Sequence, residues 1–301
     1  MKIAILSKEP SSYSTKSLVK AAQKRDHEVV VLDYTKCYMA IEARKPFIYY
    51  KGEKIEGVGA VIVRVNPAYT AYVSSVIRQF EMMGVATSIS SLAVVRAGDK
   101  LRSLQLLSRS GVQIPKTVFA RQSADVKQLI DLVGGSPVVV KLLEGTMGIG
   151  VVLAETRKAA QSLIEAFYGL GANILIQEFI EEAHGQDIRA IVVGDRVVGA
   201  MLRQGAEGDF RSNLHRGGTS APVELTQKEK NIAIKAARTL GLHVAGVDII
   251  RSKRGPLVIE VNNSPGLSGI ESQTGEDIAG AIVEHTVLKA GKKRKKDRIG
   301  A

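Results

Sequence analysis

Cysteine is almost absent from the 301-residue sequence: Cys37 stands alone, so the chain cannot form an internal disulfide. This excludes a disulfide-stapled fold and favours a reducing compartment. No apolar run approaches the roughly 18 residues that span a bilayer. The first apolar stretch, after Lys2, is four residues long, too short for a signal peptide. We therefore expect a cytoplasmic protein without a membrane partner.

Aromatic residues are also few, with eight Tyr, six Phe and no Trp, which argues against a protein built to stack nucleic-acid bases. The net charge is +12, and half of it lies in residues 289–301, which hold seven Lys or Arg and one Asp. Such a tail is typical of a solvated, disordered terminus. The alternative is a weak electrostatic contact with ribosomal RNA or an acidic protein.

The length allows about two domains, and 45% apolar residues with 24% charged residues indicate a folded chain. The first 95 residues alternate strand-like and helix-like runs, which predicts a parallel α/β sheet. Ser7-Lys8-Glu9-Pro10 follows the first strand in place of Gly-x-Gly-x-x-Gly, which argues against a dinucleotide-binding redox enzyme.

After about Asp99 the pattern changes to a helix and then to strands separated by glycine turns, which indicates an α+β arrangement. Thr226 and Glu229 form a capping-box signature, and Gly194-Asp195 is a typical hairpin turn. The predicted elements are helix Lys100–Arg109, hairpin Asp187–Val193 with Arg196–Leu202, helix Gln227–Leu240, hairpin Val244–Arg251 with Leu257–Val261, and a last helix from near Thr274.

Asp248 and Glu260 are the most informative pair. If the second hairpin turns at Arg254, they face each other on adjacent antiparallel strands, where like charges repel unless a cation lies between them. Asn262 follows on the same face opposite Gly246, which would leave open space. Carboxylate and amide oxygens suit magnesium or manganese, so we interpret Asp248, Glu260 and Asn262 as metal ligands. An exposed polar face is the alternative.

The segment Glu144-Gly-Thr-Met-Gly-Ile-Gly150 lies between two apolar strands. Backbone N–H groups and a hydroxyl there could surround a phosphate, although no Walker motif is present. Lys141 lies among aliphatic residues, where an ammonium group needs an anionic partner. A flexible hairpin and a Lys that reaches solvent are the alternatives. The candidate phosphate-binding residues are Lys141, Gly145, Thr146, Gly148 and Gly150.

Three further features fit an anionic or nucleotide ligand. Lys100 opens a helix, an unfavourable place for a cation unless an anion is near. Glu178 and Asp187 could accept hydrogen bonds from an adenine amino group and ribose hydroxyls, or they could be surface charges. The loop 209–218 is longer than a tight connection needs, which is typical of functional loops.

Together these motifs resemble the ATP-grasp superfamily and, within it, the RimK family of ligases. The resemblance runs from Met1 to about His285 and departs at Met147, Asn263 and the basic tail. It rests on Asp99–Leu107, Glu144–Val151, Gly208–Gly218 and Glu260–Gly266. It implies an N-terminal parallel α/β pre-ATP-grasp domain (1–98) and a two-lobed ATP-grasp domain (99–288, lobes about 113–177 and 178–288), followed by the tail 289–301.

The resemblance also implies an activity: ATP-dependent addition of L-glutamate to the C-terminus of a small-subunit ribosomal protein through an acyl phosphate. Two Mg²⁺ or Mn²⁺ ions would be held by Asp248, Glu260 and Asn262. ATP would be held by Lys141, Glu178, Phe179, Asp187, Arg211, Ser212 and Asn213, with Lys100 as a further phosphate contact. We expect Arg189 and Arg203 at the transferred phosphate or acyl oxygens, because the reaction needs fixed cations but no protein nucleophile.

Two other functions stay open at this point. The same site could join glutamate to a small-molecule or cofactor acceptor. A non-catalytic, basic, ribosome-associated protein is an alternative from another class. We also expect a homo-oligomer.

Overall fold

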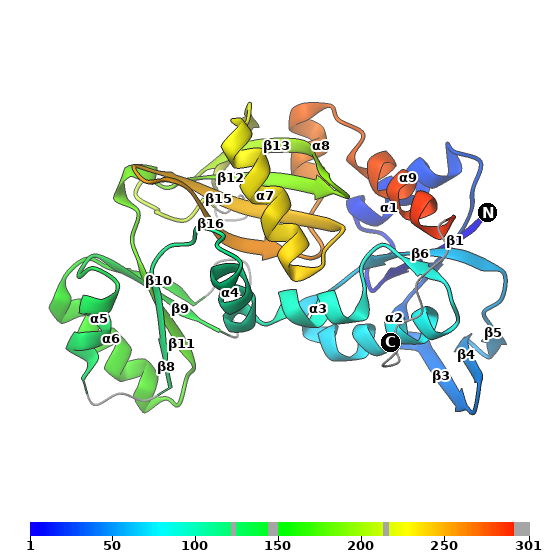
Figure 1. Cartoon of the computed structure of the whole chain (residues 1–301), viewed down its shortest axis with the longest axis horizontal. Helices are drawn as coiled ribbons and strands as arrows, with labels where there is room; N and C mark the ends of the chain where they lie inside the picture. Colours follow the sequence, from blue (N-terminus) through cyan, green and yellow to red (C-terminus); the bar gives the residue numbers. More distant parts are fainter. Residues whose placement is uncertain (122–124, 144–149, 213–216, 292–301) are drawn as a thin grey trace.

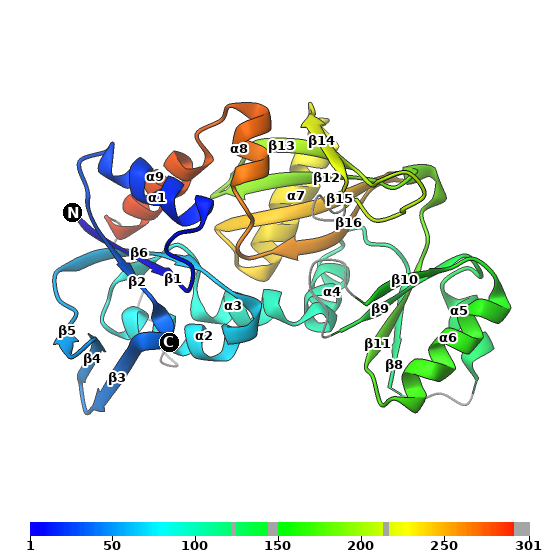
Figure 2. The same cartoon turned by 180° about the vertical axis from the view of Figure 1, so that it is seen from behind.

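The computed structural model describes residues 1–121, 125–143, 150–212 and 217–291. Its strands form a parallel sheet near the N-terminus, two antiparallel sheets in the rest of the chain and a small three-stranded sheet. Figures 1 and 2 show these units in a row, with α4 (Lys100–Arg109) between the two antiparallel sheets. The predicted combination of α/β and α+β structure is confirmed.

The N-terminal sheet has the strand order β2-β1-β6-β7, and all of its strands are parallel. Its elements are β1 (Lys2–Ser7), α1 (Tyr13–Gln23), β2 (Glu28–Leu32), β6 (Val58–Arg64), α2 (Thr70–Met82), β7 (Ala86–Thr87) and α3 (Ser91–Gly98). The sequence reading missed the three-stranded sheet, because its strands mix buried residues such as Cys37 and Ile48 with exposed ones such as Ile41 and show no regular alternation. It consists of β3 (Cys37–Glu42), β4 (Lys45–Tyr50) and β5 (Glu53–Lys54).

The middle of the chain forms a four-stranded antiparallel sheet with the order β10-β9-β11-β8, which we call the small sheet. Its strands are β8 (Thr117–Ala120), β9 (Val138–Leu142), β10 (Val151–Ala154) and β11 (Ile174–Glu178). Helices α5 (Val126–Leu132) and α6 (Arg157–Gly169) cover one face, where Val138, Val140 and Ile176 are buried. Lys141 alternates with these residues and therefore lies on the opposite face.

The large sheet has the order β14-β13-β12-β15-β16. Its strands are β12 (Gln186–Val193), β13 (Arg196–Gln204), β14 (Thr219–Pro222), β15 (Val244–Ser252) and β16 (Gly255–Asn262). Helix α7 (Gln227–Leu240) begins with the predicted capping box and ends at Gly241 in the left-handed conformation. Short 3-10 helices occur at Tyr34–Lys36, Pro67–Tyr69 and Glu181–Ala183.

The C-terminal region differs from the prediction of one last helix. Gly275, with φ of +70°, ends α8 (Ser268–Thr274), and the Asp277 side chain caps α9 (Ile278–Ala290). Lys289, which was placed in the tail, belongs to α9, and its Nζ donates to the Thr87 carbonyl at 3.1 Å. None of the helices in the described ranges is both long and apolar enough to cross a membrane.

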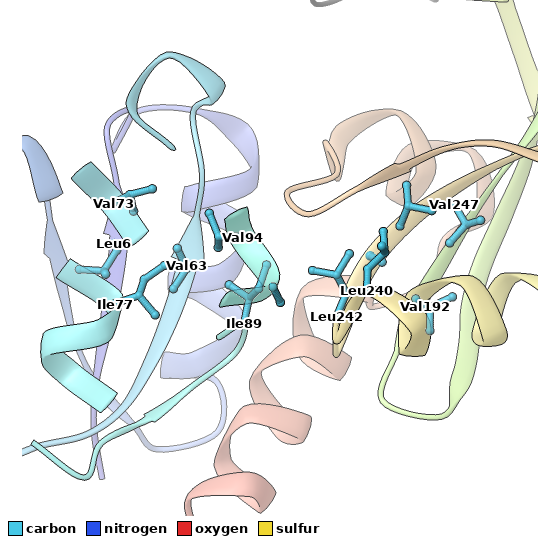
Figure 3. Packing of buried hydrophobic residues seen from close by; sticks show 14 of the residues in the cluster. Leu6, Val63, Val73, Ile77, Ile89, Val94, Val192, Leu240, Leu242 and Val247 are labelled. Atoms are coloured by element: carbon cyan, nitrogen blue, oxygen red, sulfur yellow. The ribbon is translucent and has the colours of Figure 1, made fainter. Parts of the chain in front are cut away.

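The hydrophobic core is continuous between the N-terminal sheet and the large sheet. Leu6, Val63 and Val94 lie in the same buried cluster as Leu240 and Val247 (Figure 3). The small sheet and its two helices have a cluster of their own. Polar contacts join the small sheet to the rest of the chain, including those of Lys100 with Leu142 and of Arg254 with Glu178. The charges of Glu260, Asp248 and Asp187 in the large sheet act on Lys141. The predicted domain boundaries stay predictions.

Candidate active site

The strands β15 and β16 bring the predicted metal ligands together. Asp248 pairs with Glu260, and Gly246 pairs with Asn262. The predicted pairing of Asp248 with Glu260 is confirmed, although the turn is not centred on Arg254. Ser252 pairs with Gly255, and a register shift between Asp248 and Ile249 brings Asp248 opposite Glu260. The prediction of open space beside Gly246 is wrong, because a Cβ at this position would lie 2.8 Å from the Pro265 Cβ.

Asp248 is held by two arginines, Arg189 from the adjacent strand β12 and Arg203 from β13, the next strand beyond it. Its Oδ1 accepts from Arg189 Nε at 2.8 Å and its Oδ2 from Arg189 Nη2 at 2.6 Å. Arg203 Nη2 lies 2.9 Å from the same Oδ2. Burial acts to raise the pKa of Asp248, which is 2% exposed, but the two guanidinium groups outweigh it and the pKa is lowered. Asp248 is therefore an ionised, fixed carboxylate.

Arg203 also binds Asp187, which lies directly opposite it on β12. Arg203 Nε donates to Oδ1 at 2.7 Å and Nη2 donates to Oδ2 at 2.6 Å. Ser212 adds a side-chain hydrogen bond to Asp187. Asp187, Arg203, Asp248 and Arg189 thus form a continuous line of alternating charges across three strands, which we call the charge network. A nucleotide hydroxyl at Asp187 would have to share the carboxylate with Arg203.

Glu260 lies beside the charge network but is not part of it. Its side chain is exposed, and among the described residues it makes no hydrogen bond or ion pair. Surrounding protein and the charge of Asp248 raise the pKa of Glu260, although Arg189, Lys141 and Lys100 oppose them. A carboxylate in this position is suited to gain a cation.

The fit to a divalent ion rests on Glu260 and Asn262. The Asn262 Nδ2 atom is buried and has no hydrogen-bond partner in the described part of the chain. Side-chain amides can be turned by 180°, so this position is equally suited to an oxygen ligand. Asp248 would have to exchange an arginine contact to join them. Within the described ranges, no group of three or more His, Cys, Asp or Glu is arranged to hold a metal.

Two lysines approach Glu260 from outside the large sheet. Lys141 Nζ donates to the Gln177 Oε1 at 2.7 Å, so its partner among the described residues is neutral rather than the expected anion. Burial lowers the pKa of Lys141, while Glu260 acts to raise it. Lys100 Nζ donates to the Leu142 carbonyl at 3.2 Å, and burial lowers its pKa as well. The charge of Glu260 acts to raise the pKa of both lysines and so opposes the effect of burial in each.

The predicted adenine-side residues lie where the small and large sheets meet. Glu178 pairs with Arg254 and accepts from the Lys116 N–H at 2.7 Å. The rings of Phe179 and Phe210 are 6.2 Å apart, edge to face.

The loop residue Arg211 connects the two sheets. It pairs with Asp209 through Nε at 2.9 Å and donates from Nη1 to the Val151 carbonyl at 3.2 Å. Gly150 is described, with φ of +74°. The candidates Gly145, Thr146, Gly148 and Asn213 lie outside the described residues.

The sequence reading selected the members of the charge network but missed their pairing. The turn at Gly194-Asp195 already places Asp187 near Arg203 across a hairpin. The contact between Arg189 and Asp248 joins β12 to β15, which are separated in sequence by β13, β14 and α7. No local signal in the sequence shows which of the remaining strands lies beside β12.

Comparison with known proteins gives full-length matches. Residues 1–94 match the RimK pre-ATP-grasp domain and residues 97–286 match the RimK-like ATP-grasp domain. A Vibrio cholerae serotype O1 protein named probable alpha-L-glutamate ligase is 60% identical over 298 residues, 99% of each chain. An Aliivibrio fischeri protein of the same name is 58% identical, again over 99% of each chain.

The fold is shared with solved structures as well. The ATP-grasp ligase PsnB, solved with a precursor variant, Mg and ADP, has a TM-score of 0.75 at 22% identity and covers 96% of this chain and 98% of its own. The two matched domains together span nearly the whole sequence, in the order that the motifs predicted. The chain therefore belongs to the RimK-like family and is an ATP-grasp ligase.

Proposed function

We propose that this ligase uses ATP to join L-glutamate to the C-terminus of a small-subunit ribosomal protein. The observation that carries the proposal is a set of fixed cations. Arg189, Lys141 and Lys100 act on Glu260, and Arg203 lies beside Arg189 on Asp248. The names of the relatives support glutamate as a substrate. The ribosomal acceptor rests on the family resemblance.

The reaction has two steps. The acceptor carboxylate attacks the γ-phosphorus of ATP, forming an acyl phosphate and releasing ADP. The glutamate amine then attacks the acyl carbon, an amide bond forms, and phosphate leaves while the amine loses a proton. In both steps negative charge develops on phosphate or acyl oxygens, so cations that are already in position stabilise the transition states.

The residues have separate tasks in this scheme. Lys141 and Lys100 would bind the phosphates, and Arg189 and Arg203 would face the developing oxyanion. Glu260, Asn262 and Asp248 would hold two divalent ions, magnesium or manganese, which neutralise the triphosphate when bound. The carboxylates that fix Arg189 and Arg203 also keep these side chains from moving as charge develops.

The test is ADP release from ATP with Mg²⁺ and glutamate, measured with no acceptor, with a purified small-subunit ribosomal protein, and with free cofactors or amino acids. Release that needs the ribosomal protein, together with a mass increase of that protein by glutamate residues, would support the proposal. Release with a cofactor alone would transfer the same chemistry to a small acceptor. No release with any of these acceptors would contradict the ribosomal protein as the acceptor.

Lys141→Met is expected to weaken ATP binding by at least about tenfold while leaving the fold intact. The ammonium group supplies a charge-assisted contact to phosphate, worth about 1.5–3 kcal/mol, whereas Met keeps the aliphatic stem and removes a charge that is costly to bury. Calorimetric titration with ATP measures the affinity. Lys158→Met, at an exposed position on α6, is the matched control. Unchanged affinity in the folded Lys141 variant would remove this residue from the phosphate site.

Deleting the residues after Ala290 is expected to raise the KM for the ribosomal acceptor at low salt but to leave kcat unchanged. These residues are strongly basic, and their effect on an acidic or RNA-bearing partner is electrostatic. Such an effect is screened over about 8 Å at physiological ionic strength. The difference in KM should therefore vanish as salt is added. A loss of kcat, or a salt-independent defect, would contradict an electrostatic role.

A further inference from the structure

Arg64 occupies a characteristic position in the N-terminal sheet. It is the last residue of β6, which lies beside β1, and β2 lies on the other side of β1. The strand order therefore reverses between β1 and β6. In open parallel sheets, ligands bind beyond the carboxyl ends of the strands at such a reversal. The Arg64 side chain starts at this edge.

Its contacts place Arg64 next to the active-site strand. Arg64 Nη1 donates to the Pro265 carbonyl at 2.8 Å, and Nη2 donates to the Ser264 carbonyl at 3.4 Å. The neighbouring Val65 N–H donates to the Ser264 Oγ at 2.7 Å. Ser264 is two residues beyond Asn262, at the end of the strand that carries Glu260. The guanidinium group is thus fixed where the N-terminal sheet meets the proposed site.

The partners of Arg64 differ from those of the arginines described so far. Arg189, Arg203 and Arg211 each bind an aspartate, whereas the contacts of Arg64 in the described ranges are with neutral carbonyls. Burial lowers the pKa of Arg64 to about 10, and the more distant Glu9 only partly opposes this. A desolvated guanidinium without an anion is costly. An anionic ligand would offset this cost, and a carboxylate matches the geometry of two N–H donors.

We propose that Arg64 binds a carboxylate of the incoming amino acid. The assignment rests on the proposed function. Glutamate brings two carboxylates that remain charged throughout the reaction, whereas the acceptor carboxylate becomes an acyl phosphate. In the proposed function the arginines of the charge network face the developing oxyanion, and each already binds an aspartate. Arg64 comes from the N-terminal sheet, whereas Lys141 and Lys100 come from the small sheet and α4.

The experiment compares three amines in steady-state ligation: glutamate, glutamine, which lacks the side-chain carboxylate, and glutamic acid α-amide, which lacks the α-carboxylate. Wild-type enzyme should prefer glutamate at least about tenfold over one of the two analogues, the effect of one lost charge-assisted contact. Arg64→Gln should raise the KM for glutamate at least about tenfold and abolish this preference. The KM for ATP and for the acceptor should not change. Arg64→Lys should recover part of the loss.

The controls separate the outcomes. Arg78→Gln, at an exposed position on α2, should behave as wild type. If Arg64→Gln does not fold, Arg64→Lys, which keeps the charge but not the paired donors, should still show a raised KM for glutamate. Full preference for glutamate in a folded Arg64 variant, or a raised KM for ATP or the acceptor instead, would overturn the assignment. Absence of glutamate-dependent turnover in the wild type would refute the proposed function itself.

Discussion

Glu260→Gln is expected to lower ATP turnover by at least about a hundredfold, the scale of one lost electrostatic contact at a transition state. The side chain keeps its size and loses its charge, and it is the carboxylate of the site that no described residue neutralises directly. Turnover should be measured as ADP release at saturating Mg²⁺ and acceptor. Near-normal turnover would reject Glu260 as a metal ligand. Glu181→Gln, at an exposed position, is the matched control.

The same substitution should leave the fold intact or make it more stable at pH 7 without nucleotide and metal. The pKa of Glu260 is raised in the folded chain, so its ionisation opposes folding at neutral pH. Gln removes that penalty. As the pH falls below the ordinary pKa of Glu, the carboxyl becomes protonated in both states and the difference from Gln should disappear. Thermal unfolding between pH 7 and pH 4 measures this. A destabilised variant at pH 7 would show that the carboxylate is neutralised in the free protein.

Asp248→Asn is expected to lower the free energy of unfolding by about 3 kcal/mol or more, the cost of breaking a buried ion pair. Both carboxylate oxygens bind guanidinium groups, and the side chain is 3% exposed. Arg203 keeps Asp187 as a partner, so most of the cost arises at Arg189. Urea denaturation measures the loss.

Two variants make this prediction specific. Asp248→Asn combined with Arg189→Met should regain part of the lost stability, because the unpaired charge is removed with its partner. Asp195→Asn breaks an exposed pair with Arg238 and should cost less than about 1 kcal/mol. Equal losses in the Asp248 and Asp195 variants would mean that the charge network does not stabilise the fold.

The sequence predicted what depends on neighbouring residues along the chain. The pairing of Asp248 with Glu260 follows from one hairpin, and the cap of α7 follows from Thr226 and Glu229. It could not predict contacts that depend on which distant segments meet. Pro265 fills the space beside Gly246, and β12 lies next to β15 rather than another strand. The charge network and the position of Arg64 both arise from such contacts.

The packing of α9 has a consequence for how the protein is made. Ile3 and Ile5, near the start of the chain, share a buried cluster with Ile278 and Ile282 of α9, and Arg25 of the same region pairs with Glu284. A ribosome therefore releases the N-terminal sheet long before the helix that covers it has been synthesised. The nascent chain therefore exposes the apolar surface that α9 later covers through most of translation. We expect chaperone binding during that time to limit aggregation. A stop codon before α9 should be far more damaging than one just after it.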